Sequence, residues 1–335
     1  EIPNTPEQID KFIKLPAFQN SELHFVYEAG PCGYTVYRHL KNRGLECVVI
    51  APSLIPKKPG NRIKNDRRDA KNLALLHRAG ELTPVYVPEP EDEAIRDLLR
   101  TRQDIQDGLK KVKQQINGFL LRQGMIYTGK TRWSKTHMTW LKNIKMPHAL
   151  QQVSLTEYLG EMEDREKRLQ RIDKSILNAC QTWRLYPYVK SLQALRGVAL
   201  FHAVTIVAEG GDLSRFDKAT QFMGYAGVVP SEHSSGGSVK RGAITKTGNS
   251  QLRKALIEAA HAYNKPARNG ATIRKRQEDL PDEVCEIAWN AQTRLCGRYR
   301  LMTARGKNYN RVITAIAREL CGFIWAIART VNRQT

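Results

Sequence analysis

Two aspartates, Asp66 and Asp69, stand three residues apart in the stretch IKNDRRDAKNLALL, which runs from residue 63 to residue 76. This spacing places both carboxylates on one face of a predicted helix, within reach of a single cation. Mg²⁺ prefers hard oxygen ligands and is commonly held by one or two carboxylates together with water and substrate phosphate. Aspartates in the first turn of a helix also favour its dipole and pair with neighbouring arginines. The spacing alone favours this second interpretation and leaves the metal site open.

A third acidic residue, Glu28, comes near the end of the apolar stretch LHFVYEAG at residues 23–30, which predicts a buried strand. A carboxylate in that place needs a cation or a set of hydrogen bonds, because burying it without a partner is costly. Glu28, Asp66 and Asp69 together are therefore candidates for part of a two-metal site for phosphoryl transfer.

A second cluster of reactive residue types is the stretch VVPSEHSSGGSVKRGAITKTGNSQLRKAL, residues 228–256. Its glycines let the backbone approach a ligand closely, and its cations suit a phosphodiester. A serine held there could attack phosphorus and store the bond as a phosphoserine. An ordinary Gly/Ser surface loop before a helix is the alternative. The cations expected to contact nucleic acid are Lys240, Arg241, Lys246, Arg253 and Lys254.

The charge of the chain points to the kind of partner. There are 54 Lys and Arg residues against 33 Asp and Glu, a net charge of +21. Such an excess predicts a polyanionic partner. An anionic membrane surface is the competing partner, but no apolar run reaches the length of a spanning helix and no signal peptide is evident. The six cysteines lack metal-site spacing, which indicates a reduced, cytoplasmic compartment.

The elements that must position these residues fall into three regions. Residues 1–89 alternate helices with continuous apolar strands at 23–30, 46–52 and 84–88, a pattern typical of an α/β domain with a largely parallel sheet. Residues 90–186 predict two long antiparallel helices, a coiled coil that serves as a spacer or a dimerisation device. The first has an apolar stripe spaced alternately by four and three residues, at Ile105, Leu109, Val112, Ile116 and Phe119.

The third region, residues 187–335, is mainly helical. Residues 192–216 predict a helix, a tight Gly turn and a second helix, either a helix-hairpin-helix whose backbone N–H groups meet a phosphate or a plain helical hairpin. The basic stretch at residues 296–311 is either a phosphate-contact surface or a solvated face. The final amphipathic helix, residues 311–330, is interpreted as core packing.

Together these stretches resemble one family, the DEDD transposases of bacterial insertion sequences, relatives of the Piv DNA invertase that act as bridge-RNA-guided recombinases. Over nearly the whole chain, the order and separation of the shared segments make the resemblance specific. The segments are YEAGPCGY (27–34), KNDRRDAKNLA (64–74), LQALRGVALFHAVTIVAEGGDLSRF (192–216), QFMGYAGVVPSEHSSGG (221–237) and GAITKTGNSQLRKAL (242–256).

The resemblance implies a RuvC-like (RNase H fold) α/β N-terminal domain, an α-helical coiled-coil middle and a mainly α C-terminal transposase domain. Carried over, the glutamate of the family's acidic quartet falls on Glu28 and its last two aspartates fall on Asp66 and Asp69. The nucleophile falls on Ser235, immediately before the paired glycines, with Ser234 as the alternative. The family's first aspartate lies on an opening strand of the form GIDVHK, which this chain does not contain. The N-terminal strands and one metal ligand are therefore expected to be missing.

The implied function is an RNA-guided DNA recombinase that mobilises an insertion sequence in the bacterial cytoplasm. Mg²⁺ would be bound by the acidic residues, and Ser235 would form a covalent protein–DNA intermediate. The implied partners are donor and target DNA, a guide (bridge) RNA, and further copies of the chain in a dimer or tetramer. Two alternatives remain open: a metal-dependent junction-resolving nuclease without serine catalysis, and a non-catalytic nucleic-acid-binding protein. The basic charge does not distinguish RNA from DNA.

Overall fold

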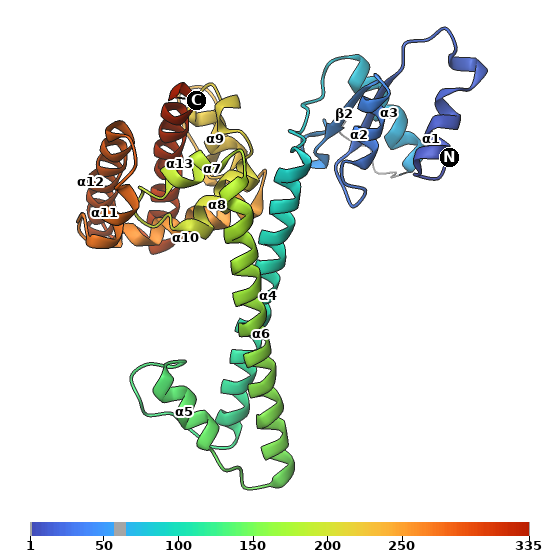
Figure 1. Cartoon of the computed structure of the whole chain (residues 1–335). Coiled ribbons are helices and arrows are strands. Elements are labelled where there is room, and N and C mark those ends of the chain that lie inside the picture. The colour runs from blue at the N-terminus through green and yellow to red at the C-terminus, as the bar shows by residue number, and fades with distance from the viewer. Residues whose placement is uncertain (1, 57–64, 335) are drawn as a thin grey trace. The chain divides into compact units, whose positions relative to one another are not determined.

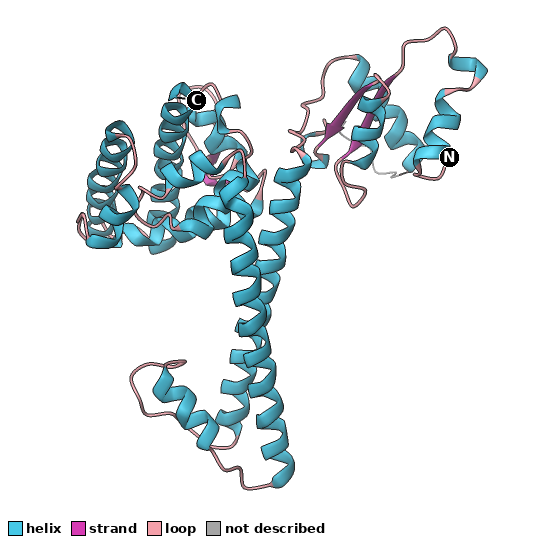
Figure 2. Cartoon of the chain, viewed as in Figure 1, coloured by secondary structure: helices cyan, strands magenta, loops and turns pink. Residues whose placement is uncertain are grey.

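The computed structural model describes residues 2–56 and 65–334, and most of them are helical (Figure 2). The chain divides into two compact units, Glu1–Glu89 and Pro90–Thr335. No helix in the described part is both long enough and apolar enough to span a membrane.

The first unit is built around a parallel pair of strands, β1 (His24–Glu28) and β2 (Glu46–Ile50), which pair in register from His24 opposite Glu46 to Glu28 opposite Ile50. The connection between them contains α2 (Thr35–Asn42), so the predicted strand–helix–strand order with parallel pairing is confirmed. The unit also contains α1 (Pro6–Ile13), α3 (Asp66–Arg78) and two short 3₁₀ turns, η1 (Pro16–Phe18) and η2 (Pro52–Leu54).

Two strand predictions were wrong in part. The stretch at residues 84–88 contributes only an isolated bridge between Pro84 and Ile50, not a strand. The first strand is not buried: its three central side chains are half-buried and those of His24 and Glu28 are exposed. The physical reason is that β1 pairs with β2 alone among the described residues, and the apolar core beside the pair is small, centred on Leu40 and Cys47.

The second unit begins with two long helices, α4 (Pro90–Arg122) and α6 (Ala149–Thr182), which lie side by side (Figure 1). They are antiparallel, because Arg102 pairs with Asp173 at 2.6 Å and Lys113 pairs with Glu166 at 3.0 Å. Val112, Ile116 and Phe119 of the predicted stripe are buried between them and α5 (Lys135–Asn143), whereas Ile105 and Leu109 are half-buried. Both predicted long helices are confirmed.

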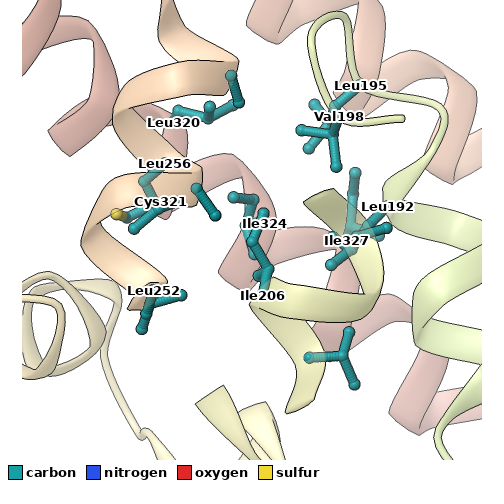
Figure 3. Close-up of a cluster of buried hydrophobic side chains, with 14 of the residues drawn as sticks. Leu192, Leu195, Val198, Ile206, Leu252, Leu256, Leu320, Cys321, Ile324 and Ile327 are labelled. Carbon is teal, nitrogen blue, oxygen red and sulfur yellow. The ribbon is translucent and has the colours of Figure 1, made fainter. Parts of the chain in front are cut away.

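The C-terminal helices enclose a large apolar core around α13 (Tyr309–Gln334). Ile324, Ile327, Leu320 and Cys321 of this helix meet leucines and isoleucines from three other helices (Figure 3). The interpretation of this helix as core packing is confirmed. The surrounding elements are α7 (Tyr186–Leu192), α8 (Leu200–Gly210), η3 (Leu213–Arg215), α9 (Ala219–Tyr225), α10 (Ser250–Ala260), η4 (His261–Asn264), α11 (Ala271–Gln277) and α12 (Asp282–Ala304).

The turn between α7 and α8 is packed inside this unit. Gly197 has φ +82°, and a Cβ placed there would lie 2.2 Å from the carbonyl oxygen of Ala259. The carbonyl oxygen of Val198 accepts a hydrogen bond from Arg276 at 3.0 Å. These contacts favour the plain helical hairpin over a phosphate-binding turn, because protein atoms already cover the backbone of the turn.

The base of the long helical pair shares the C-terminal core. Ile95 and Leu99 of α4 and Ile176 of α6 belong to the same buried cluster as α8 and α13. The helical pair and the C-terminal helices are therefore one compact unit, Pro90–Thr335. The predicted division into domains at residues 89 and 186 stays a prediction.

Candidate active-site residues

The predicted serine loop is a β-hairpin. Its strands are β3 (Pro230–Glu232) and β4 (Arg241–Ile244), which pair antiparallel with Glu232 opposite Arg241. At the tip, Ser235 and Ser238 exchange two backbone hydrogen bonds of 3.2 Å across the turn. Gly236 has φ +57° in this turn, a conformation that glycine adopts without strain. The paired glycines thus place Ser235 at the exposed end of the hairpin.

The two candidate serines differ in their contacts. Ser234 donates a hydrogen bond from Oγ to Oε1 of Glu232 at 2.9 Å, and Arg241 donates to Oε2 of the same carboxylate at 3.3 Å. These two contacts, Ser234 first, lower the pKa of Glu232. A carboxylate with a lowered pKa is a weak general base near neutral pH, so Glu232 does little to activate Ser234. The hydroxyl of Ser235 has no hydrogen-bond partner among the described residues.

The segment after β4 is held against the protein by close backbone contacts. A Cβ on Gly248, which has φ +79°, would lie 2.0 Å from the carbonyl oxygen of Tyr225. Arg253 donates to the carbonyl oxygens of Ala226 at 3.2 Å and Thr247 at 3.4 Å. The predicted contact between Arg253 and nucleic acid stays a prediction. In the structure, the guanidinium of Arg253 holds the segment after β4 through these two hydrogen bonds.

The other predicted nucleic-acid contacts are more accessible. Lys240 and Arg241 are exposed on the hairpin, and Lys246 is exposed just after it. Lys254, on the first turns of α10, is half-buried. Three of the five predicted cations are therefore exposed, and one of these, Arg241, also pairs with Glu232.

Asn249 fixes the end of this segment. Its Oδ1 accepts hydrogen bonds from the backbone N–H groups of Gln251 and Leu252 at 2.9 and 3.0 Å, which caps α10. Its Nδ2 donates to Glu209 at 2.6 Å. Glu209, only 1% exposed, also accepts two hydrogen bonds of 3.3 Å from Arg100. This network was not identified from the sequence. The feature that could have indicated it is Glu209 itself, a single acidic residue in the mostly apolar helix α8.

The acidic residues lie in the first unit. Glu28 is the exposed last residue of β1, and Asp66 is the exposed first residue of α3. Asp69 follows in the first turn of α3 and is half-buried. Asn65 caps this helix by accepting a hydrogen bond from the N–H of Arg67 at 3.0 Å.

The structure supports one part of the second interpretation: Asp66 and Asp69 both lie in the first turn of α3, where they favour the helix dipole. Within residues 2–56 and 65–334, neither Asp66 nor Asp69 forms an ion pair, so the expected pairing with nearby arginines is absent there. In the same ranges, no three His, Cys, Asp or Glu residues are arranged to hold a metal ion. The structure therefore does not bring Glu28, Asp66 and Asp69 together as a ligand set. Their oxygen donors do have the chemistry that Mg²⁺ prefers.

Comparisons with known proteins agree with the resemblance. Residues 189–275 match the family described as Transposase IS116/IS110/IS902, and residues 1–124 match a second family model, the DEDD transposase of IS110. The y4qE protein of Sinorhizobium fredii, named as a transposase, is 44% identical over all 335 residues and 83% of its own length. The chain belongs to the IS110/IS116 family of DEDD transposases.

Other relatives of this transposase are more distant. The transposase for insertion sequence element IS1533 of Leptospira borgpetersenii is 29% identical over 92% of the chain and 90% of the relative. The transposase for IS1111A of Coxiella burnetii is 24% identical over 70% of the chain and 64% of the relative. The two family matches include both clusters of interest: the match over residues 1–124 contains the acidic residues, and the match over residues 189–275 contains the serine hairpin.

Proposed function

We propose that this transposase cuts and rejoins DNA through a phosphoserine intermediate on Ser235 and so mobilises an insertion sequence. The observation that carries the proposal is the hairpin tip, where Ser235 is exposed and its hydroxyl has no partner among the described residues. Lys240 and Arg241 on the same hairpin supply cations for the phosphodiester. A nucleophile with this accessibility can reach a DNA backbone, which a buried serine cannot.

The proposed reaction conserves the phosphodiester bond. The Oγ of Ser235 loses its proton and attacks phosphorus, and the bond from phosphorus to one strand oxygen breaks. The released strand end carries the hydroxyl, and the serine ester holds the other end. A hydroxyl from an exchanged strand then attacks the ester and frees Ser235. No water enters, so the DNA is rejoined rather than hydrolysed.

The proposed metal ligands are Glu28, Asp66 and Asp69, and the proposed metal is Mg²⁺. When bound, a divalent cation stabilises charge on the phosphoryl oxygens. The first and second units would have to bring the acidic residues and the hairpin to one phosphodiester, within one chain or between copies in a dimer or tetramer. The guide RNA is proposed from the resemblance, and the net charge of +21 supports binding of any such polyanion.

The test is a covalent-adduct assay. Purified protein, with any small RNA that copurifies, is incubated with matched DNA and Mg²⁺ and run on a denaturing gel. We expect an adduct with the wild type and with Ser234→Ala, and none with Ser235→Ala. Strand exchange by Ser235→Ala would favour the metal-dependent nuclease instead. Asp66→Asn should lose the adduct while keeping DNA binding; unchanged exchange by that variant would contradict the proposed metal role.

A further inference from the structure

A groove of about 580 Å³ lies between β4 and the first half of α13. Arg241 and Ile244 of β4 line one part of it, and Arg311, Thr314 and Arg318 of α13 line another. No acidic residue lines the groove in the described part of the chain. The surface therefore combines an apolar contribution with three guanidinium groups, and it adjoins the hairpin that carries the candidate nucleophile.

The arginines of the groove are available to an external anion. Arg311 and Arg318 form no ion pair with any described residue. Arg241 pairs with Glu232 at 3.3 Å, but both side chains are about half exposed or more, at 64% and 48%. Such exposed pairs contribute little and exchange readily for a stronger anion. Binding a phosphate here does not require a buried interaction to be broken.

The spacing of these cations matches a nucleic-acid backbone. Arg311 and Arg318 are seven residues apart on one helix, a rise of about 10 Å. One strand of duplex DNA advances about 3.4 Å per nucleotide along its axis, so this rise corresponds to about three nucleotides. A small anion would not need two guanidiniums at that separation. Single-strand binding through stacked bases is disfavoured, because no aromatic side chain lines the groove in the described residues.

We infer that this groove binds the sugar–phosphate backbone of duplex DNA on one side of the phosphate that Ser235 attacks. The hairpin register gives the distance: Ser235 lies opposite Ser238 and Glu232 opposite Arg241, an offset of three residues, or about 10 Å. The groove thus begins about three nucleotides from the attacked phosphate. This position rests on the proposed role of Ser235, whereas DNA binding by the groove does not.

The experiment measures duplex binding by the full chain as a function of salt. The test variant carries Arg311→Gln and Arg318→Gln; the control carries Arg168→Gln and Arg171→Gln, two exposed arginines of α6 without ion pairs among the described residues. The two variants remove equal charge. Each lost phosphate contact lowers the magnitude of the negative slope of log K against log salt by about 0.9. We expect the magnitude of the slope to fall by about 1.8 in the test variant. If the test variant and the wild type bind equally at about 1 M salt, this corresponds to about 60-fold weaker binding by the test variant at about 0.1 M salt.

The control variant should keep a slope near that of the wild type, and both should melt like the wild type. Equal losses in test and control variants would overturn the groove as the binding site. A loss seen with RNA of the same sequence but not with duplex DNA would also overturn it. A methylphosphonate about three nucleotides from the attacked phosphate should erase the difference between wild type and test variant. A reduced slope without any serine adduct in the wild type would leave the groove standing and refute the proposed role of Ser235.

Discussion

The most informative stability experiment is the substitution Glu209→Gln. The Glu209 side chain is 1% exposed and contacts three groups: Arg100 at 3.3 Å, Asn249 at 2.6 Å and Arg96 at 4.0 Å. The Arg96 side chain is itself only 8% exposed, and Glu209 is the carboxylate beside it. Glutamine keeps the shape and one acceptor oxygen but removes the charge. The buried guanidinium of Arg96 then has no counterion among the residues that the structure describes.

The expected cost follows from which partner is left unpaired. Removing one member of a buried ion pair costs about 3–5 kcal/mol, because the remaining charge stays desolvated. Arg100 is 53% exposed and can be solvated by water, so we place the loss for Glu209→Gln near the lower value, about 3 kcal/mol. Arg100→Gln should cost less, because the Glu209 carboxylate keeps Asn249 at 2.6 Å and Arg96 at 4.0 Å as partners.

Tryptophan fluorescence during urea unfolding can measure this difference. All five tryptophans lie at or after residue 133, so the signal reports on the unit Pro90–Thr335. Glu157→Gln, an exposed position on α6, is the matched control and should change the free energy of unfolding by at most about 0.5 kcal/mol. A loss for Glu209→Gln no larger than that for Arg100→Gln would refute the argument that the buried charge pair matters.

Three further predictions are independent of the proposed reaction. Gly197→Ala should destabilise the unit more than Gly306→Ala, which urea unfolding can measure. Both glycines have positive φ, which costs alanine about 1–2 kcal/mol. At Gly197 the added Cβ would also lie 2.2 Å from the carbonyl oxygen of Ala259. Ser234→Ala should raise the pKa of Glu232 toward its ordinary value of 4.5, which carboxyl NMR titration can measure. In the wild type, the stabilisation from the Ser234–Glu232 hydrogen bond is complete above the ordinary pKa and is lost as the pH falls through the lowered pKa of Glu232. Burial raises the pKa of Cys321 to about 12, so this thiol should resist iodoacetamide at pH 8 until the protein unfolds.

The sequence predicted the helical parts of the fold better than the strands. A stripe such as Val112, Ile116 and Phe119 repeats at helical spacing over many residues, so it identifies both the element and its buried face. A short apolar run such as residues 84–88 identifies neither, because strand formation depends on a neighbouring strand that the run itself does not specify. Burial of Glu28 was mispredicted for the same reason: it depends on what covers β1.

The candidate site was predictable where local geometry depends on a few adjacent residues. Paired glycines after Ser235 predict a tight turn with an exposed serine, and the structure has that turn. The groove was predictable only in part: Arg241 and Arg311 lie in stretches considered for phosphate contact, but Arg318 lies in a helix whose dominant pattern is apolar and which was interpreted only as core packing. Its contribution appears only when β4 and α13 are adjacent in three dimensions. The metal role of Asp66 and Asp69 remains a prediction from the resemblance.

The buried network around Glu209 connects the long helices physically to the hairpin. Arg100 belongs to α4, Glu209 to α8, and Asn249 ends the segment that leaves β4. The carboxylate of Glu209 therefore joins α8 to the two other parts. A buried carboxylate tolerates little displacement, because each lost hydrogen bond leaves charge without compensation. A shift of α4 relative to α8 must therefore either break these bonds or move Asn249 and the cap of α10. These contacts connect the position of the hairpin base to the position of the long helical pair through Glu209, a residue that is only 1% exposed.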